Sequence, residues 1–180
     1  AVSGAAVACE STTGAYSIPP VGGAQTYTWT GTGGVNVLTG NGTTGVTVGF
    51  DPGFTQGTLC VSAGLSCGFN SVQRCFTIKN STGILGAMSG PFALCPGQSN
   101  QVFSVPSANG AASYQWTVPN NVTIISGQGT PSLTVDVGTN FNVGQLCVTA
   151  TSNCGEVSPS RCKTLASVSP PTPGNIVGSL

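Results

Sequence analysis

Hydrophobic and polar residues alternate with a period of two along most of this chain. The alternating runs are short and rich in valine, threonine and aromatic residues, and clusters of glycine, proline, asparagine and serine separate them. β-strands bounded by turns show this pattern, because successive side chains of a strand point to opposite faces. No stretch of useful length has helical periodicity. The sequence therefore predicts an all-β fold built from short strands.

The predicted strands form two similar series of seven. The first series is predicted at residues 5–9, 14–18, 25–30, 35–39, 46–50, 58–63 and 73–79. The second is predicted at residues 92–95, 101–105, 113–118, 122–125, 133–137, 145–150 and 161–166. Seven short strands with one tryptophan on the third are typical of an immunoglobulin-like β-sandwich.

The second series repeats the first at an offset of 87 residues. The matching pairs are Cys60 with Cys147, Cys67 with Cys154, Cys75 with Cys162, Tyr27 with Tyr114, and Trp29 with Trp116. Internal repeats of this kind indicate tandem copies of one folding unit. We expect module one at residues 1–86, module two at residues 87–174, and the start of a third module at residues 175–180.

The eight cysteines fall into two sets of four, and each set allows three pairings. Cys60 and Cys75 lie on consecutive predicted strands, so they can face each other across a hairpin, which leaves Cys9 for Cys67. The same reasoning pairs Cys147 with Cys162 and Cys95 with Cys154. We therefore expect two disulfides per module, and a chain that matures outside a reducing cytosol.

A four-cysteine zinc site is the alternative use of each set. Structural zinc sites use pairs of cysteines separated by two to four residues. In this chain 50, 6 and 7 residues lie between successive cysteines of module one. The spacing therefore favours disulfides over a metal site, and no cofactor is expected.

Charged residues are rare: the chain has four Lys or Arg, four Asp or Glu, and no His. Four basic residues neutralise few phosphates, so nucleic acid is not an expected partner. The carboxylates do not occupy matching positions in the two modules, and no histidine is present to activate a nucleophile. We therefore expect no enzymatic activity. No apolar run approaches the roughly 20 residues that cross a bilayer, so no membrane span is expected.

Two repeated features invite a functional interpretation. The pairs Tyr27/Trp29 and Tyr114/Trp116 each point to one face of a strand, where they serve either as core residues or as a platform for sugars. We favour the core. Arg74 and Arg161 each precede a strand cysteine, and they either make local hydrogen bonds or contact a partner.

Module two resembles a known family over nearly its whole length. Residues 89–98 (SGPFALCPGQ), 112–119 (ASYQWTVP) and 146–155 (LCVTATSNCG) resemble the PKD-like, immunoglobulin-like repeats of large Bacteroidota surface proteins. Module one is a looser match, with Gly31-Thr-Gly-Gly34 where module two has Val118-Pro119. The resemblance implies a β-sandwich repeat in a secreted or surface-displayed protein, often exported by the type IX system.

Adhesins and components of gliding motility are among the proteins that the resemblance implies. We therefore expect a non-catalytic structural repeat of an extracellular bacterial surface protein, forming the stalk of a long adhesin or filament. Its expected partners are neighbouring repeats, and possible further ones are other copies in a filament or surface glycans. A self-assembling filament subunit and a carbohydrate-binding module are the alternatives.

Overall fold

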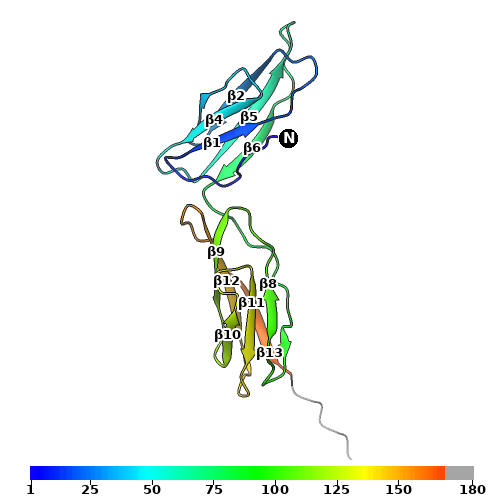
Figure 1. Ribbon diagram of the computed structural model, residues 1–180, viewed down its shortest axis with the longest axis vertical. Helices are drawn as coiled ribbons and strands as arrows, with labels where there is room; N and C mark the ends of the chain where they lie inside the picture. Colours follow the sequence, from blue (N-terminus) through cyan, green and yellow to red (C-terminus); the bar gives the residue numbers. More distant parts are fainter. Residues whose placement is uncertain (169–180) are drawn as a thin grey trace, which may run out of the picture.

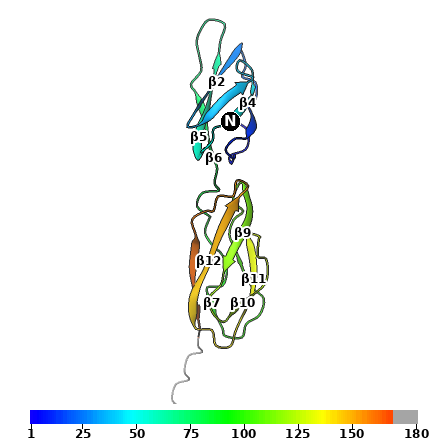
Figure 2. The same cartoon turned by 90° about the vertical axis from the view of Figure 1, so that its left-hand side faces the viewer.

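Two β-sandwiches are stacked end to end along the long axis of the molecule, in the computed structural model that describes residues 1–168 (Figure 1). We call the N-terminal sandwich module one and the other module two. A view turned by 90° shows the same arrangement (Figure 2). The described residues contain strands and no helix, which confirms the predicted all-β class. The expected start of a third module lies outside the described residues.

Each module consists of two sheets. Module one contains β1 (Thr13–Ser17), β2 (Thr26–Thr32), β3 (Val35–Thr39), β4 (Gly45–Phe50), β5 (Gln56–Gly64) and β6 (Arg74–Lys79). Module two contains β7 (Ala93–Leu94), β8 (Gln101–Ser104), β9 (Ala111–Thr117), β10 (Val122–Ser126), β11 (Ser132–Val137), β12 (Val143–Ser152) and β13 (Arg161–Ser167). The sheet orders are β1-β4-β3 and β2-β5-β6 in module one, and β10-β11-β8 and β7-β13-β12-β9 in module two.

Each sandwich has a hydrophobic core of its own. Along β2 the burial alternates, so that Tyr27 and Trp29 point inward while the threonines beside them are exposed. In module two Trp116, Phe103 and Leu146 are at most 1% exposed. Burial of each such side chain contributes about 1.5–3 kcal/mol. The two cores share no residue, so each module has the means to fold as a unit.

The strand predicted at residues 5–9 does not form. This segment makes only one parallel bridge, between Val7 and Lys79, at the C-terminal end of β6. Its counterpart in module two is the two-residue strand β7, which pairs in parallel with the end of β13. Both segments touch the sheet only at its end, because the chain then turns away toward the end face of the module.

The hairpin loops occupy defined ends of the molecule. The loop between β5 and β6 lies at the end of module one that points away from module two (Figure 1). The equivalent loop between β12 and β13 lies at the boundary between the modules (Figure 1). These positions decide which cysteines meet.

Candidate functional site at the module boundary

Two disulfides join the hairpins as the sequence predicts. Cys60 is directly opposite Cys75 in the β5–β6 register, and the disulfide between them has a Cα–Cα distance of 4.0 Å. Cys147 and Cys162 form the equivalent disulfide in module two, with a Cα–Cα distance of 4.1 Å. Each closes a sequence separation of 15 residues. In the loop-entropy model a bridge of this size stabilises its module by about 3 kcal/mol.

The third disulfide crosses the module boundary and corrects the predicted pairing. Cys9 of module one is bonded to Cys154 of module two, with a Cα–Cα distance of 5.1 Å and a sequence separation of 145 residues. The predicted pairs Cys9–Cys67 and Cys95–Cys154 do not form. In the described residues Cys67 and Cys95 are unpaired and exposed.

The length of β6 explains why Cys9 does not reach Cys67. Cys9 follows the segment that pairs with Lys79, at one end of β6, whereas Cys67 belongs to the loop that precedes the other end. A six-residue strand spans about 20 Å, and disulfide partners have Cα atoms within about 7 Å. The prediction assumed that each set of four cysteines is closed within one module. The missing information was that the first segment ends at the boundary.

Polar and apolar contacts surround the bridge. The Ser152 hydroxyl donates to the carbonyl oxygen of Asn80 at 2.9 Å, which ties module two to the segment leaving module one. The Val7 side chain lies against Gly110, where a Cβ atom would overlap it. Gly110 therefore lets the two modules approach closely. Its carbonyl also accepts the amide of Asn153 at 3.1 Å, next to Cys154.

Two carboxylates line a small pocket at the boundary. Glu10 and Glu156 both border it, beside the Cys9–Cys154 bridge. The Glu10 carboxylate accepts the backbone amide of Gly53, so it holds a loop of module one. In the part of the chain that the structure describes, no three Cys, Asp or Glu side chains gather as metal ligands would.

The aromatic pairs are part of the cores. Tyr27, Trp29, Tyr114 and Trp116 are between 1% and 7% exposed. Tyr27 and Tyr114 accept the amides of Val21 and Ala108 at 2.9 and 2.7 Å. The indole Nε1–H groups donate to the carbonyls of Thr43 and Thr130, both at 2.9 Å. Buried rings with satisfied polar atoms have no face to offer a sugar.

A loop covers the outer edge of β2 and of β9. In module one the Asn41 side chain accepts the Trp29 amide at 2.9 Å, and in module two Gln128 accepts the Trp116 amide at 3.0 Å. The backbone of Gly42 exchanges hydrogen bonds with Tyr27, and that of Gly129 does so with Tyr114. Unpaired strand edges attract other strands. These loops satisfy the edges instead. Both have the sequence Gly-x-Gly-Thr, at residues 40–43 and 127–130, and the sequence alone did not reveal this role.

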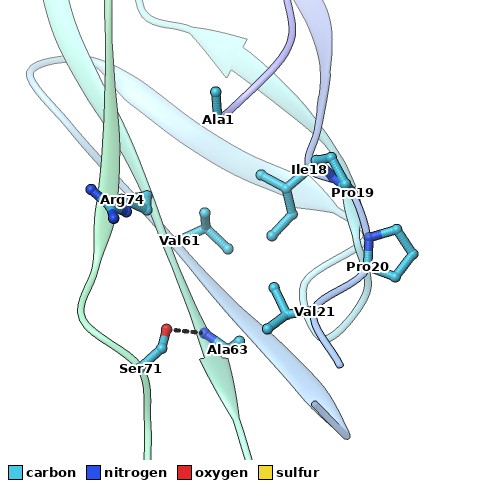
Figure 3. A pocket seen from close by; sticks show the side chains of 9 residues that line it. All are labelled: Ala1, Ile18, Pro19, Pro20, Val21, Val61, Ala63, Ser71 and Arg74. Carbon is cyan, nitrogen blue, oxygen red and sulfur yellow. Dashed lines mark hydrogen bonds between the residues drawn. The ribbon is translucent and has the colours of Figure 1, made fainter. Parts of the chain in front are cut away.

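The repeated arginines have different surroundings. Arg161 donates from Nε to the carbonyl of Gly86 at 3.2 Å, within its own chain, which agrees with the local interpretation. Arg74 borders an apolar pocket of module one that includes Ile18, Val21 and Val61 (Figure 3). The one hydroxyl at this pocket, from Ser71, accepts the amide of Ala63 at 3.0 Å. The pocket therefore brings together apolar surface and no reactive set of groups.

Tyr16 is a buried titratable residue in the core of module one. Its side chain is 2% exposed and its hydroxyl donates to the Ala5 carbonyl at 2.8 Å. Burial raises the pKa of Tyr16 above its usual value of 10.0, because the phenolate loses hydration. Such a residue stabilises the core in its neutral form.

Among the described residues, no helix is long and apolar enough to cross a membrane.

Several solved structures are similar to this chain. SGBP-B of the Bacteroides ovatus mixed-linkage glucan utilization locus, in complex with a mixed-linkage heptasaccharide, is 9% identical with a TM-score of 0.31, over 90% of this chain and 43% of that one. The D00-D0 domain of intimin is 12% identical with a TM-score of 0.31, over 90% and 98%. The BSP domain of a biofilm associated protein is 20% identical with a TM-score of 0.30, over 94% and 30%.

The chain thus spans less than half the length of the first of these structures. No curated protein sequence matches it. The model of the PKD-like domain matches twice, at residues 1–78 and 81–164, once for each module. The two matches cover most of the chain and coincide with the two sandwiches. The chain belongs to the PKD-like domain family, as a tandem of two domains.

Proposed function

We propose that this chain is a non-catalytic structural repeat of an extracellular bacterial surface protein, in which it forms part of the stalk of a long adhesin or filament. The proposed organisation is module one at residues 1–86, module two at residues 87–174, and a further module from residue 175. The observation that supports the proposal most strongly is the disulfide Cys9–Cys154, which fastens two sandwiches end to end.

The bridge shortens the covalent path along the rod. A pull on the two ends passes from the first residues to Cys9, through the disulfide to Cys154, and then along β13. The chain between the two cysteines is closed off by the bridge and is not stretched. At about 3.4 Å per extended residue, the separation of 145 residues corresponds to roughly 500 Å of protected chain. This is the property expected of a stalk that carries tension.

An extracellular location is part of the proposal. The three disulfides support it, because such bonds persist in oxidising compartments. A role in attachment or gliding motility and export by the type IX system rest on the sequence resemblance alone. Carbohydrate binding, the second alternative, would need residues other than the four buried aromatic ones.

Single-molecule pulling on the oxidised chain tests the proposal. We expect the oxidised protein to extend by only a short length before the bond itself is loaded. The variant Cys9→Ser should extend further by roughly 400 Å, because the closed loop is then free to unfold except where the two hairpin bridges still hold it. Cys67→Ser is the matched control, since it replaces an unpaired cysteine of the same module. Equal extension of the oxidised protein and the Cys9→Ser variant would contradict a tension-bearing bridge.

A further inference from the structure

The two unpaired cysteines are the repeat counterparts of the two that form the boundary bridge. Cys67 corresponds to Cys154 at an offset of 87 residues, and Cys95 corresponds to Cys9 at an offset of 86. Cys9 and Cys154 are bonded to each other, whereas Cys67 and Cys95 are free and exposed. Each module thus carries one cysteine of either type, one on a hairpin loop and one on its first segment.

The loop that carries Cys67 has the conformation of the loop that carries Cys154. In both loops the glycine that follows the cysteine donates its amide to a carbonyl three residues earlier. Gly68 donates to Leu65, and Gly155 donates to Ser152, both at 3.0 Å. Both glycines have positive φ, 85° and 83°, a conformation that glycine adopts at low cost. The turn that presents Cys154 to module one therefore presents Cys67 in the same way.

The segment that carries Cys95 matches the one that carries Cys9. Each cysteine follows a residue in parallel pairing with the last strand of its module: Val7 with Lys79, and Ala93 with Ala166. The amides of Lys79 and Ala166 donate to equivalent carbonyls, those of Ala6 and Phe92, both at 3.0 Å. Cys95 therefore lies at the end of module two where β13 ends, as Cys9 lies at the end of module one where β6 ends.

The free cysteines lie at opposite ends of the molecule. Cys67 belongs to the β5–β6 loop at the far end of module one, and Cys95 directly follows β7 at the far end of module two (Figures 1 and 2). They do not meet within one copy. An end-to-end contact with another module pair brings a Cys95 to a Cys67 in the relation that Cys9 has to Cys154.

We propose that Cys67 and Cys95 are complementary half-bridges, through which this module pair is joined head to tail to a further PKD-like module. The adjoining PKD-like module supplies the complementary cysteine at either end, and in a solution of this chain alone a second copy takes that place. The resulting bond repeats the Cys9–Cys154 bridge at the next boundary. This inference rests on the geometry of the boundary and does not require the stalk role.

The surface around Cys67 fits such a contact. Val21, Leu65 and Phe69 are 45–73% exposed and line one mainly apolar hollow, and Val72 of the same loop is 86% exposed. At the existing boundary Val7 lies against Gly110. The repeat places Ala93 and Gly23 at the corresponding positions of the new contact, and their small size lets the ends approach.

The bond forms by thiol–disulfide exchange with a small disulfide oxidant such as glutathione disulfide. The Cys67 thiolate attacks one sulfur of the oxidant, and a mixed disulfide forms while one glutathione thiolate leaves. The Cys95 thiolate of the second copy then attacks the protein sulfur, and the second glutathione thiolate leaves. The two protein thiols lose two protons and two electrons, and the oxidant is reduced to two glutathione thiols.

Two single variants test the orientation of the contact. Cys67→Ser retains only Cys95 as a free thiol, and Cys95→Ser retains only Cys67. Each is incubated alone and in an equal mixture in a glutathione redox buffer, and the products are separated on a non-reducing gel. We expect monomers from each variant alone and dimers from the mixture, with the Cys95 peptide linked to the Cys67 peptide by mass spectrometry. The wild-type chain should form a ladder of oligomers that reductant abolishes.

Two outcomes would overturn the inference. One is dimerisation of each variant alone to the same extent as in the mixture, which indicates random oxidation of exposed thiols. The other is a mixture that stays monomeric, which indicates that the ends do not recognise each other. Both variants keep the Cys9–Cys154 bridge. A negative result in the gel assay therefore leaves the pulling experiment unaffected, and a negative result in the pulling experiment leaves the gel assay unaffected.

Discussion

Modules one and two have similar interiors but differ at the end that carries the hairpin loop. In module two this end faces module one, and it has Ser152 and Glu156 where module one has Leu65 and Phe69. Leu65 and Phe69 are 45% and 73% exposed, at an end that contacts nothing in this structure. The sheets, by contrast, carry a buried tryptophan, a buried tyrosine and a hairpin disulfide at equivalent positions. The comparison teaches that strands preserve the fold while end faces set what each module joins.

The largest expected effects come from the two buried tryptophans. Trp29→Ala and Trp116→Ala should each lower the free energy of unfolding of their own module by about 3–5 kcal/mol, because each leaves a large cavity. Unfolding in urea and unfolding in a calorimeter should each show two transitions, one for each module. The transition that shifts identifies the affected module. Ile125→Ala, at an exposed position, is the control with a change below about 0.5 kcal/mol. Equal loss in both modules from one substitution would contradict separate cores.

The hairpin disulfides should have the next largest effect. Replacing Cys60 and Cys75 together by serine should lower the free energy of unfolding of module one by about 3 kcal/mol, and the same change at Cys147 and Cys162 should do so in module two. Thermal unfolding of the two double variants measures this. Unchanged thermal unfolding midpoints in both double variants would show that the hairpin bridges do not stabilise the modules.

The edge-covering amides should have a smaller effect. Asn41→Ala and Gln128→Ala each leave a tryptophan amide without its acceptor, at a cost of about 1–2 kcal/mol. The exchanges Asn41→Gln and Gln128→Asn keep the amide and should cost less, which makes them the matched controls. Hydrogen exchange at the Trp29 and Trp116 amides reports the loss directly. Unchanged exchange rates in the alanine variants would mean that the loops do not cover these edges.

The smallest expected difference concerns pH. Module one has Tyr16 where module two has Phe103, and burial raises the pKa of Tyr16. The unfolded state ionises first as pH rises past 10.0, so the contribution of the neutral tyrosine is complete below that pH and is lost as pH rises through the folded-state pKa. Module one should therefore lose stability in alkali that module two keeps. Tyr16→Phe should remove the difference, and an equal alkaline loss in that variant would count against this origin.

Much of the fold could be predicted from the sequence. The period-two pattern and the 87-residue repeat predicted β3 at its observed residues and most other strands to within two residues, because alternation follows directly from which side chains are buried. The tryptophans were predicted as core residues, and the structure buries them. The hairpin disulfides were also predicted correctly, because the two cysteines of each pair lie on consecutive strands.

The boundary was harder to predict, for a physical reason. Whether Cys9 reaches Cys67 or Cys154 depends on how far apart the ends of β6 lie and on how two separate sandwiches stack. Neither quantity leaves a local pattern in the sequence. The strand expected at residues 5–9 was wrong for a related reason, since the segment is apolar as a strand can be but the chain leaves the sheet after one bridge.

Mapping of the disulfides in protein isolated without reductant tests the covalent joint between the modules most directly. Proteolysis at mildly acidic pH, which suppresses exchange, followed by mass spectrometry should yield a peptide around Cys9 linked to a peptide around Cys154. Recovery of Cys9 linked to Cys67 instead would show that each module closes its own bridges, and it would contradict both the joined rod and the half-bridges at its ends.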